Sequence, residues 1–382
     1  MTAEDRADLR RVVLVINQLG RGGAEAQLSL LAQGLRARGI DTHVILTCEG
    51  GPHLTALRLA GVEVHQLDFV PSLTSLVRPS ALVHNLGAGM RLLRLLRRLR
   101  PQVLHAFLYF DYVLSAPAAR LSGVPVVVSG RRSQGFYKRG RRWVFALERA
   151  ATRITDHVVA NAVAVAQDAR TAERLPARKL SVIYNGLPAS AFEPVEPEEV
   201  GTHLPVIVCV ANLHPVKGHR FLLDAAATLA RRGRPCTLVL AGDGPERDRL
   251  ERQAAVLGLD VRFRGSVDDP RGLVARADVV VLPSLSEGLS NAVMEAMAAG
   301  RPTVATSVGG TPELLDGRGV LIPASDPAAL AEAVLRLLDD PELGARLGAA
   351  ARAWAAKNLD MTVMVEEHIA LYRRLLEARC AE

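Results

Sequence analysis

Two glutamates with seven residues between them stand in the segment SEGLSNAVMEAMAAG, residues 286–300, and acids so placed could bind hydroxyl groups or transfer protons. The apolar, β-branched run ADVVVLPS precedes them and predicts a buried parallel strand. The alanine-rich run that follows, with Gly300 and Pro302 at its end, predicts a helix. Glu287 therefore lies in a tight loop, and Glu295 lies one to two turns into the helix.

The start of this helix favours a sugar-binding interpretation of the two acids. Ser290 or Asn291 is suited to cap the helix, and its free amides attract anions, so a carboxylate beside them serves a purpose other than phosphate binding. A glutamate accepts paired hydrogen bonds from the vicinal hydroxyls of a ribose or a hexose. The alternative for Glu295 is a polar position on an exposed helix face. A hydrolytic acid/base pair fits less well, because nothing else in the chain indicates a glycosidase barrel.

Two further loops carry residues that could bind phosphate. Gly22 and Gly23 follow the buried run RVVLVINQL and open a helix, where glycine permits close approach and the helix amides attract anions. A tight strand-to-helix turn explains these glycines equally well, since the full G-x-G-x-x-G spacing is absent. Lys217 follows another buried run, in the loop HPVKGH. It could neutralise a diphosphate, or it could be a solvated loop charge.

The elements around these loops predict an α/β protein with two doubly wound parallel sheets. Buried strands alternate with helices, a proline- and glutamate-rich segment interrupts the alternation, and a second series of strands and helices follows. The predicted division is a first domain at 1–190, a linker at 191–203, a second domain at 204–358, and a helix at 359–382 that packs back on the first domain.

Composition limits the classes of protein to consider. The 382 residues suggest two domains, and no apolar run approaches the length of a membrane span. The four cysteines show no paired spacing, and the acidic N-terminus is unlike a secretory signal, so we expect a reducing, cytoplasmic location. Residues 1–190 hold 26 Lys and Arg against 13 Asp and Glu, whereas the remainder holds 21 against 27. The basic half therefore suggests an anionic partner.

The motifs, taken together, resemble those of the family 4 retaining glycosyltransferases. The run SEGLSNAVMEAMAAGRPTVATSVGGTPEL is similar to the E-x7-E region of that family, and GGAE, VIYNG, VKGH, AGDGPE, VRFRGSV and LYRRLL stand in the family's order. The similarity spans nearly the whole chain. It implies a GT-B fold of two facing Rossmann-like domains, the second binding a nucleotide-sugar and the first an acceptor. It also implies a UDP-sugar as donor, since these are the family's most common donors.

The resemblance also implies roles for individual residues. Glu295 would bind the ribose hydroxyls, Glu287 would lie by the donor sugar, and Lys217 would lie on the diphosphate. The other residues implied for the donor lie beside its sugar, diphosphate or base: Gly288, Leu289, Ser290, Asn291, Asn212, Gly265, Val267, Gly22 and Gly23. His105 matches a histidine common in the first domain and would act in catalysis; an ordinary histidine near the ligand crevice is the alternative.

The chain departs from the family pattern at two positions. Asn212 stands where an arginine is frequent, so one cation on the diphosphate is missing, and Arg131, Arg132 or Arg220 could replace it. Arg131 itself stands where a histidine is frequent, which leaves the catalytic base open. We see no D-x-D and no His/Asp/Glu cluster with metal-ligand spacing, so we expect neither a metal nor a cofactor.

The mechanism and acceptor are expectations drawn from the resemblance and from the basic half. The family's description implies retention by front-face attack, with the departing phosphate accepting the acceptor's proton. Two basic stretches, MRLLRLLRRLR at 90–100 and GRRSQGFYKRGRRWVF at 130–145, suit an anionic bilayer and a lipid-linked acceptor, with peripheral attachment to the inner membrane face. A solvated basic face is the alternative, and nucleic acid is not expected.

Three other functions compete with glycosyl transfer. A GT-B-fold sugar-nucleotide epimerase needs no second substrate, and a non-catalytic protein that binds a sugar-nucleotide or a glycan needs no turnover. Retention of both glutamates and of Lys217 argues against the binding protein. A nicotinamide dehydrogenase fits least, because the G-x-G-x-x-G pattern and its downstream acid are missing.

Overall fold

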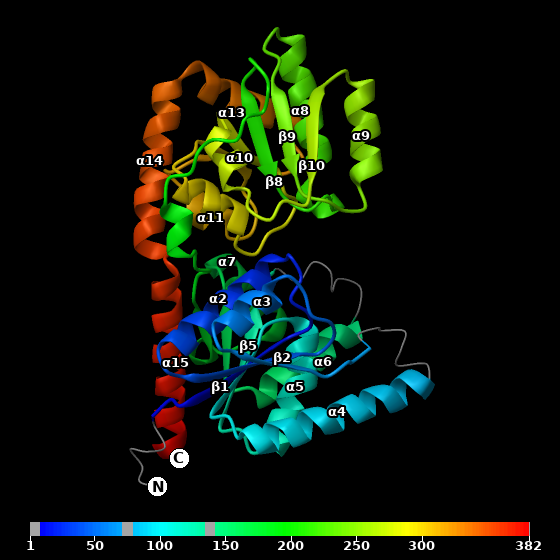
Figure 1. Cartoon of the computed structure of the whole chain (residues 1–382), viewed down its shortest axis with the longest axis vertical. Coiled ribbons are helices and arrows are strands. Elements are labelled where there is room, and N and C mark those ends of the chain that lie inside the picture. Colours follow the sequence, from blue (N-terminus) through cyan, green and yellow to red (C-terminus); the bar gives the residue numbers. More distant parts are fainter. Residues whose placement is uncertain (1–7, 71–78, 134–141, 382) are drawn as a thin grey trace. The chain divides into compact units, whose positions relative to one another are not determined.

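The structure is a computed structural model that describes residues 8–70, 79–133 and 142–381. It divides into two compact units (Figure 1). The first unit comprises Met1–Gly186 and Met361–Glu382, and the second comprises Leu187–Asp360. None of the helices formed by the described residues combines the length and the hydropathy that crossing a membrane requires.

The first unit is built on a parallel sheet in which the described residues form seven strands, in the order β3-β2-β1-β4-β5-β6-β7. Most of these strands are buried on both faces, which explains their continuous apolar runs. Their bounds are β1 (Arg11–Ile16), β2 (Asp41–Leu46), β3 (Glu63–Gln66), β4 (Val103–Ala106), β5 (Val126–Arg131), β6 (His157–Ala160) and β7 (Leu180–Val182).

Helices cover both faces of this sheet. Val12 and Leu14 of β1 pack with α2, α3 and α15, whereas Val13 and Val15 pack with α4 and α5 on the other face. This alternation of side chains along β1 is what a doubly wound sheet requires. The helices of the unit are α2 (Gly23–Ala37), α3 (His53–Leu59), α4 (Pro79–Leu99), α5 (Tyr109–Leu121), α6 (Arg142–Ile154), α7 (Val163–Glu173), the 3-10 turn η3 (Ala177–Lys179), and α15 (Met361–Ala381).

The last helix of the chain, α15, returns to the first unit and packs beside α2 (Figure 1). Met364, Val365 and Ile369 of α15 belong to the same buried cluster as the α2 leucines. A Cβ atom at Gly34 of α2 would lie only 2.4 Å from a methyl group of Val365, so glycine permits this close approach. The prediction that the last helix packs on the first half is confirmed.

The second unit repeats the architecture with six described strands in the order β10-β9-β8-β11-β12-β13. All of its strand pairs are parallel. The prediction of two Rossmann-like α/β halves is therefore confirmed. The strands are β8 (Val206–Val210), β9 (Thr237–Ala241), β10 (Asp260–Gly265), β11 (Val279–Leu282), β12 (Thr303–Thr306) and β13 (Val320–Ile322).

Helices also surround this second sheet, and two buried clusters of side chains join them to it. The 3-10 turns are η4 (Ala189–Phe192) and η5 (Pro215–Lys217). The α-helices are α8 (His219–Arg231), α9 (Arg247–Val256), α10 (Arg271–Arg276), α11 (Asn291–Ala298), α12 (Thr311–Leu315), α13 (Pro327–Asp339) and α14 (Pro341–Asn358).

Candidate functional site

The candidate site lies in the second unit, where the order of strands along the sheet reverses. Strand β8 pairs with β9 on one side and with β11 on the other. Loops that leave β8 and β11 therefore begin at adjacent carboxyl ends and diverge, which is where doubly wound sheets bind ligands. The loop after β8 carries Lys217, and the loop after β11 carries Glu287.

The structure brings Lys217 and Glu287 into direct contact. The Lys217 Nζ atom lies 2.6 Å from Oε1 of Glu287, and the Ser284 hydroxyl donates to the same oxygen at 2.7 Å. The Glu287 side chain is 8% exposed and that of Lys217 is 26% exposed. A carboxylate so buried needs a cation and a donor to offset its desolvation, and both are present. The arrangement holds one positive and one negative group side by side at the edge of the sheet.

Glycines hold the loops around this pair in place. Gly218 has a φ of 69°, and a Cβ atom there would lie 2.1 Å from the carbonyl oxygen of Pro283. The loops after β8 and β11 are also joined by a hydrogen bond of 2.7 Å, which the Leu285 amide donates to the Val216 carbonyl. Only glycine can occupy position 218 without strain. These contacts between the two loops direct Lys217 toward the loop that carries Glu287.

A third loop supports Glu287 from its other side. Gly309, after β12, has a φ of 55°, and a Cβ atom there would lie 2.0 Å from the backbone oxygen of Glu287. The Gly310 amide donates a 2.7 Å hydrogen bond to the carbonyl of Gly288. Gly288 and Leu289 are both buried in this contact. The sequence GGTPE thus serves to position the SEGLSN loop.

Glu295 lies on α11, the helix that the SEGLSN loop opens. Ser290 is the N-cap residue of α11, and its hydroxyl accepts a hydrogen bond from the Val293 amide at 3.4 Å. The prediction of Ser290 or Asn291 as the cap is therefore resolved in favour of Ser290. Burial and, to a smaller extent, the nearby charge of Asp269 together raise the pKa of Glu295 to about 7. A carboxyl group with a pKa near 7 can accept hydrogen bonds from hydroxyl groups and can also donate to them.

The other residues predicted for the donor lie along the same carboxyl edge of the sheet. Asn212 is exposed just after β8. Gly265 ends β10 with a φ of 66°, and its carbonyl accepts a 2.7 Å hydrogen bond from the Gly242 amide. Val267 follows it and packs on a buried cluster of the sheet. All three residues follow parallel strands of one sheet, so they share an edge with Lys217 and Glu287.

Sequence reasoning missed two residues of this site. Ser284 hydrogen-bonds Glu287, and its own carbonyl accepts from the Thr306 hydroxyl. His219, the first residue of α8, is buried, and neither ring nitrogen has a hydrogen-bond partner among the described residues. Burial, with a smaller effect of Lys217, lowers the pKa of His219 to about 4, so its imidazole is neutral. The HPVKGH motif already contained His219, but only the fold shows its burial.

In the first unit, the turn at Gly22 and Gly23 is already in contact with an acidic side chain of the protein, that of Glu25. Gly22 caps α2 without a side chain, and a Cβ atom there would lie 2.2 Å from Oε2 of Glu25. Glu25 is buried, and this burial raises its pKa, although hydrogen bonds from its own amide and from Gln18 act in the opposite direction. A phosphate approaching Gly22 and Gly23 would meet this carboxyl group, so their role remains a prediction.

His105 lies inside the first unit and is 0% exposed. Its Nδ1 atom is 2.7 Å from the hydroxyl of Tyr372, and its Nε2 atom has no partner among the described residues. Burial lowers the pKa of His105 well below its usual value, and the charges of His368 and Arg132 lower it further. The ring is therefore neutral and linked to α15. Its catalytic role stays a prediction.

The cations proposed as substitutes for the missing family arginine differ in their availability. Arg131 donates to both carboxylate oxygens of Glu173 at 2.7 Å inside the first unit, so it is committed to a buried ion pair. Arg132 donates to Asn185 and lies over the ring of Phe107. Arg131 is thus already paired with Glu173 and is not available to a diphosphate.

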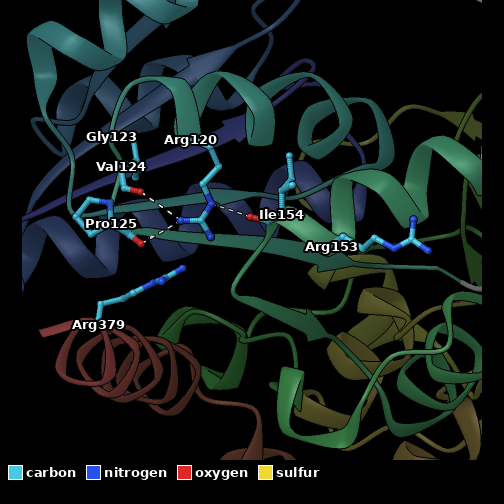
Figure 2. A pocket seen from close by; sticks show the side chains of 7 residues that line it. All are labelled: Arg120, Gly123, Val124, Pro125, Arg153, Ile154 and Arg379. Atoms are coloured by element: carbon cyan, nitrogen blue, oxygen red, sulfur yellow. Dashed lines mark hydrogen bonds between the residues drawn. The ribbon is translucent and has the colours of Figure 1, made fainter. Parts of the chain in front are cut away.

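A pocket rich in arginine lies elsewhere in the first unit, at the amino-terminal ends of its strands (Figure 2). Arg120 donates to the carbonyls of Val124, Pro125 and Ile154 and pairs with Asp156. These contacts already satisfy the guanidinium group. The pocket lies at the edge of its sheet opposite the one at which doubly wound folds bind ligands.

Comparison with known proteins identifies the family. A model described as Glycosyltransferase Family 4 matches residues 21–190, and one described as Glycosyl transferases group 1 matches residues 204–340. An alpha-D-kanosaminyltransferase of Streptomyces kanamyceticus is 30% identical over 298 residues, or 70% of this chain and 74% of that protein. The chain belongs to glycosyltransferase family 4. The resemblance seen in the sequence is therefore confirmed.

Two other similarities cover part of the chain or concern its fold. A GDP-mannose-dependent alpha-(1-6)-phosphatidylinositol monomannoside mannosyltransferase of Mycolicibacterium smegmatis is 38% identical over 167 residues, which cover 40% of this chain and 44% of that protein. The crystal structure of Anabaena HepE in complex with UDP-glucose matches with a TM-score of 0.81 and 22% identity, over 94% of this chain and 98% of that one. At this identity the match shows the fold alone, which is GT-B.

Proposed function

We propose that this family 4 glycosyltransferase moves a sugar from a nucleotide-sugar to a hydroxyl group of a glycan or a lipid-linked acceptor, with retention at the anomeric carbon. The second unit binds the donor, and the first unit binds the acceptor. The contact of Lys217 with Glu287, at the point where the strand order of the second sheet reverses, carries this proposal. A cation and an acid there match two adjoining parts of a nucleotide-sugar, the diphosphate and the hexose hydroxyls.

Each group has a separate task in the proposed reaction. Glu295 accepts hydrogen bonds from the ribose hydroxyls, and Glu287 accepts them from the sugar. Lys217 and the amides at the start of α11 stabilise the charge that develops on the departing diphosphate. The bond from the anomeric carbon to the phosphate oxygen breaks as the bond to the acceptor oxygen forms on the same face. The acceptor's proton passes to the departing phosphate oxygen, so positioning supplies most of the rate.

The nucleotide is proposed to be UDP. HepE, which shares the fold, was crystallised with UDP-glucose, whereas the mycobacterial relative is named as dependent on GDP-mannose. A thermal-shift screen of UDP- and GDP-sugars, followed by NMR of the product made from the best donor, tests donor and stereochemistry together. A product with inverted anomeric configuration would contradict the mechanism. Release of free nucleotide that requires an acceptor would exclude an epimerase.

The acceptor is proposed to lie at a membrane surface, because one side of α4 exposes apolar residues followed by basic ones. Val83, Leu86 and Met90 are 70%, 62% and 48% exposed and recur at helical spacing along α4. Arg94 and Arg97 are exposed and continue this side of the helix. A helix with these two features suits an anionic bilayer. Residues 134–141, which are half of the second basic stretch, lie outside the described residues.

Sedimentation with anionic vesicles at low and high salt tests this docking. We expect binding at low salt that weakens at high salt, and further loss in the Leu86→Ser variant. Leu59→Ser is a matched control, since Leu59 is an equally apolar residue that is 85% exposed on α3. If the wild-type protein fails to bind at low salt, α4 is only a solvated basic helix.

A further inference from the structure

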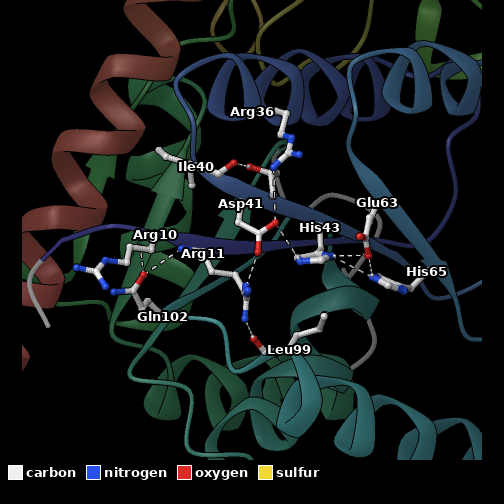
Figure 3. Close-up of polar contacts among 11 residues, drawn as sticks. Arg10, Arg11, Arg36, Ile40, Asp41, His43, Glu63, His65, Leu99 and Gln102 are labelled. Carbon is white, nitrogen blue, oxygen red and sulfur yellow. Dashed lines mark hydrogen bonds and ion pairs between the residues drawn. The ribbon is translucent and has the colours of Figure 1, made fainter. Parts of the chain in front are cut away.

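The first unit carries a cluster of metal-ligating side chains that its proposed reaction does not use. His43 comes from β2, and Glu63 and His65 come from the neighbouring edge strand β3. The parallel register pairs His43 with Glu63 and Ile45 with His65. Because side chains alternate along a strand, Glu63 and His65 lie on one side of β3, and Figure 3 shows both directed at the imidazole of His43.

The distances within this cluster match the coordination shell of a single ion. The Nδ1 atom of His43 lies 3.2 Å from Nε2 of His65 and 3.4 Å from Oε2 of Glu63, and the last two atoms are 3.8 Å apart. Ligands at about 2.0–2.1 Å from a tetrahedral metal are separated by about 3.3–3.4 Å. An ion at the centre of these three atoms would need only small movements of Glu63 and His65.

A hydrogen bond between the two imidazoles would explain only part of this geometry. It would use one nitrogen of each ring, but Nε2 of His43 is buried and has no hydrogen-bond partner among the described residues. That atom lies 3.5 Å from Oδ1 of Asp41. A carboxylate facing the far nitrogen of a ligating histidine is the usual support of a zinc-bound imidazole, because it fixes the tautomer and the ring orientation.

The support of Asp41 is itself held in place. Arg11 donates to Oδ2 of Asp41 at 2.5 Å, and Arg36 lies 3.7 Å from Oδ1 (Figure 3). These cations neutralise Asp41, so Glu63 supplies the negative charge that faces the ion. Two neutral imidazoles and one carboxylate are a common ligand set for Zn²⁺, with water at the fourth position. The Glu63 side chain is 70% exposed, which gives solvent access to that position.

We propose that His43, His65 and Glu63 bind a divalent transition-metal ion, of which Zn²⁺ fits best, with Asp41 as the support of His43. The ion joins the short edge strand β3 to β2. None of its ligands belongs to the candidate donor site, which lies in the second unit, so the ion is assigned a role in stabilising the sheet edge. Sequence reasoning expected no metal cluster, because His43 and His65 are 22 positions apart and only the strand pairing brings them together.

Titration of the tag-free, chelator-treated full chain with Zn²⁺ and with Co²⁺ tests the site. We expect one ion per chain, a rise in Tm with Zn²⁺, and the visible absorption of tetrahedral Co²⁺. His65→Gln and Glu63→Gln should each weaken Zn²⁺ binding by about 10-fold to 100-fold. Both residues are accessible, so these variants should fold, whereas His43 is buried.

His203→Gln, which removes an exposed histidine of the second unit, is the matched control and should bind Zn²⁺ as the wild type does. Absence of Zn²⁺ binding in the wild type would overturn the proposal. Binding that His65→Gln and Glu63→Gln leave unchanged would overturn it as well, because the ion would then occupy another place.

Discussion

The ammonium group of Lys217 lies 2.6 Å from the carboxylate of Glu287, although 70 positions of sequence separate the two residues. Neither the loop after β8 nor the loop after β11 contains both charges, so the pair exists only because β8 and β11 are neighbours in the sheet. In a site made from two separate loops, Lys217 can exchange its partner Glu287 for another anion. We infer that a donor diphosphate competes with Glu287 for Lys217.

Removal of either charge should slow transfer strongly and leave the fold intact. We expect Lys217→Ala and Glu287→Ala each to lower kcat by about 10²–10³, the usual effect of losing one electrostatic stabiliser. Circular dichroism and Tm measure the fold, and a coupled assay for released nucleotide measures the rate. Lys357→Ala, which removes an exposed lysine of α14, is the control.

The double variant adds a second measurement. Because the two groups touch, the effects of Lys217→Ala and Glu287→Ala on unfolding free energy should couple by about 0.5–3 kcal/mol. Strict additivity would mean that the contact is of no consequence in solution. Near-normal turnover in either single variant would contradict the assigned roles.

Glu295 should make the stability of the protein depend on pH. Its pKa in the folded protein, about 7, lies above that of an ordinary glutamate, 4.5. Between these values the folded state binds more protons than the unfolded state, so stability is fully present below about pH 4.5 and falls as the pH rises toward 7. The loss is on the order of 1–3 kcal/mol.

Glu295→Gln replaces the carboxyl group with an amide that stays neutral, so this variant should lack this part of the fall in stability with rising pH. Urea denaturation of both proteins at a series of pH values measures it, and the difference between them should grow from pH 4.5 to 7. Parallel pH profiles for the two proteins would show that Glu295 titrates normally. The same substitution should weaken nucleotide binding, since an amide accepts fewer hydrogen bonds from the ribose.

Much of the second unit's site could be predicted from the sequence, because buried parallel strands leave continuous apolar runs. The run ADVVVLPS at 277–284 contains β11 (Val279–Leu282), and the alanine-rich run becomes α11, so Glu287 and Glu295 fall in the predicted loop and helix. Positive-φ glycines such as Gly218 also stand in recognisable motifs. These features depend on local sequence and on the burial pattern alone.

The remaining features depend on contacts between distant parts of the chain, which no spacing reveals. Arg131 forms an ion pair with Glu173, which lies 42 positions away in the sequence. His105 forms a hydrogen bond with Tyr372, which lies 267 positions away. In each case, tertiary packing decides which polar group is left to meet a ligand.

The contact between Tyr372 and His105 should be worth more to stability than to catalysis. Tyr372→Phe leaves Nδ1 of the buried His105 without its partner, so unfolding free energy should fall by about 1–3 kcal/mol. Chemical denaturation measures the loss. A fall in kcat that exceeds the loss of folded protein would instead indicate that His105 acts in the reaction.

Gly309 offers a test of how tightly the Glu287 loop is supported. Gly309→Ala should lower kcat and stability together, because the new Cβ atom would lie 2.0 Å from the Glu287 carbonyl and push the loop away from Lys217. Gly317→Ala is the matched control, since Gly317 has a φ of 69° against 55° for Gly309 but has open space around its Cβ position. Both variants carry the cost of a left-handed alanine, about 1 kcal/mol. The extra loss in Gly309→Ala, measured by denaturation and by turnover, therefore reports the steric overlap alone, and equal losses in the two variants would show that the loop moves without consequence for the site.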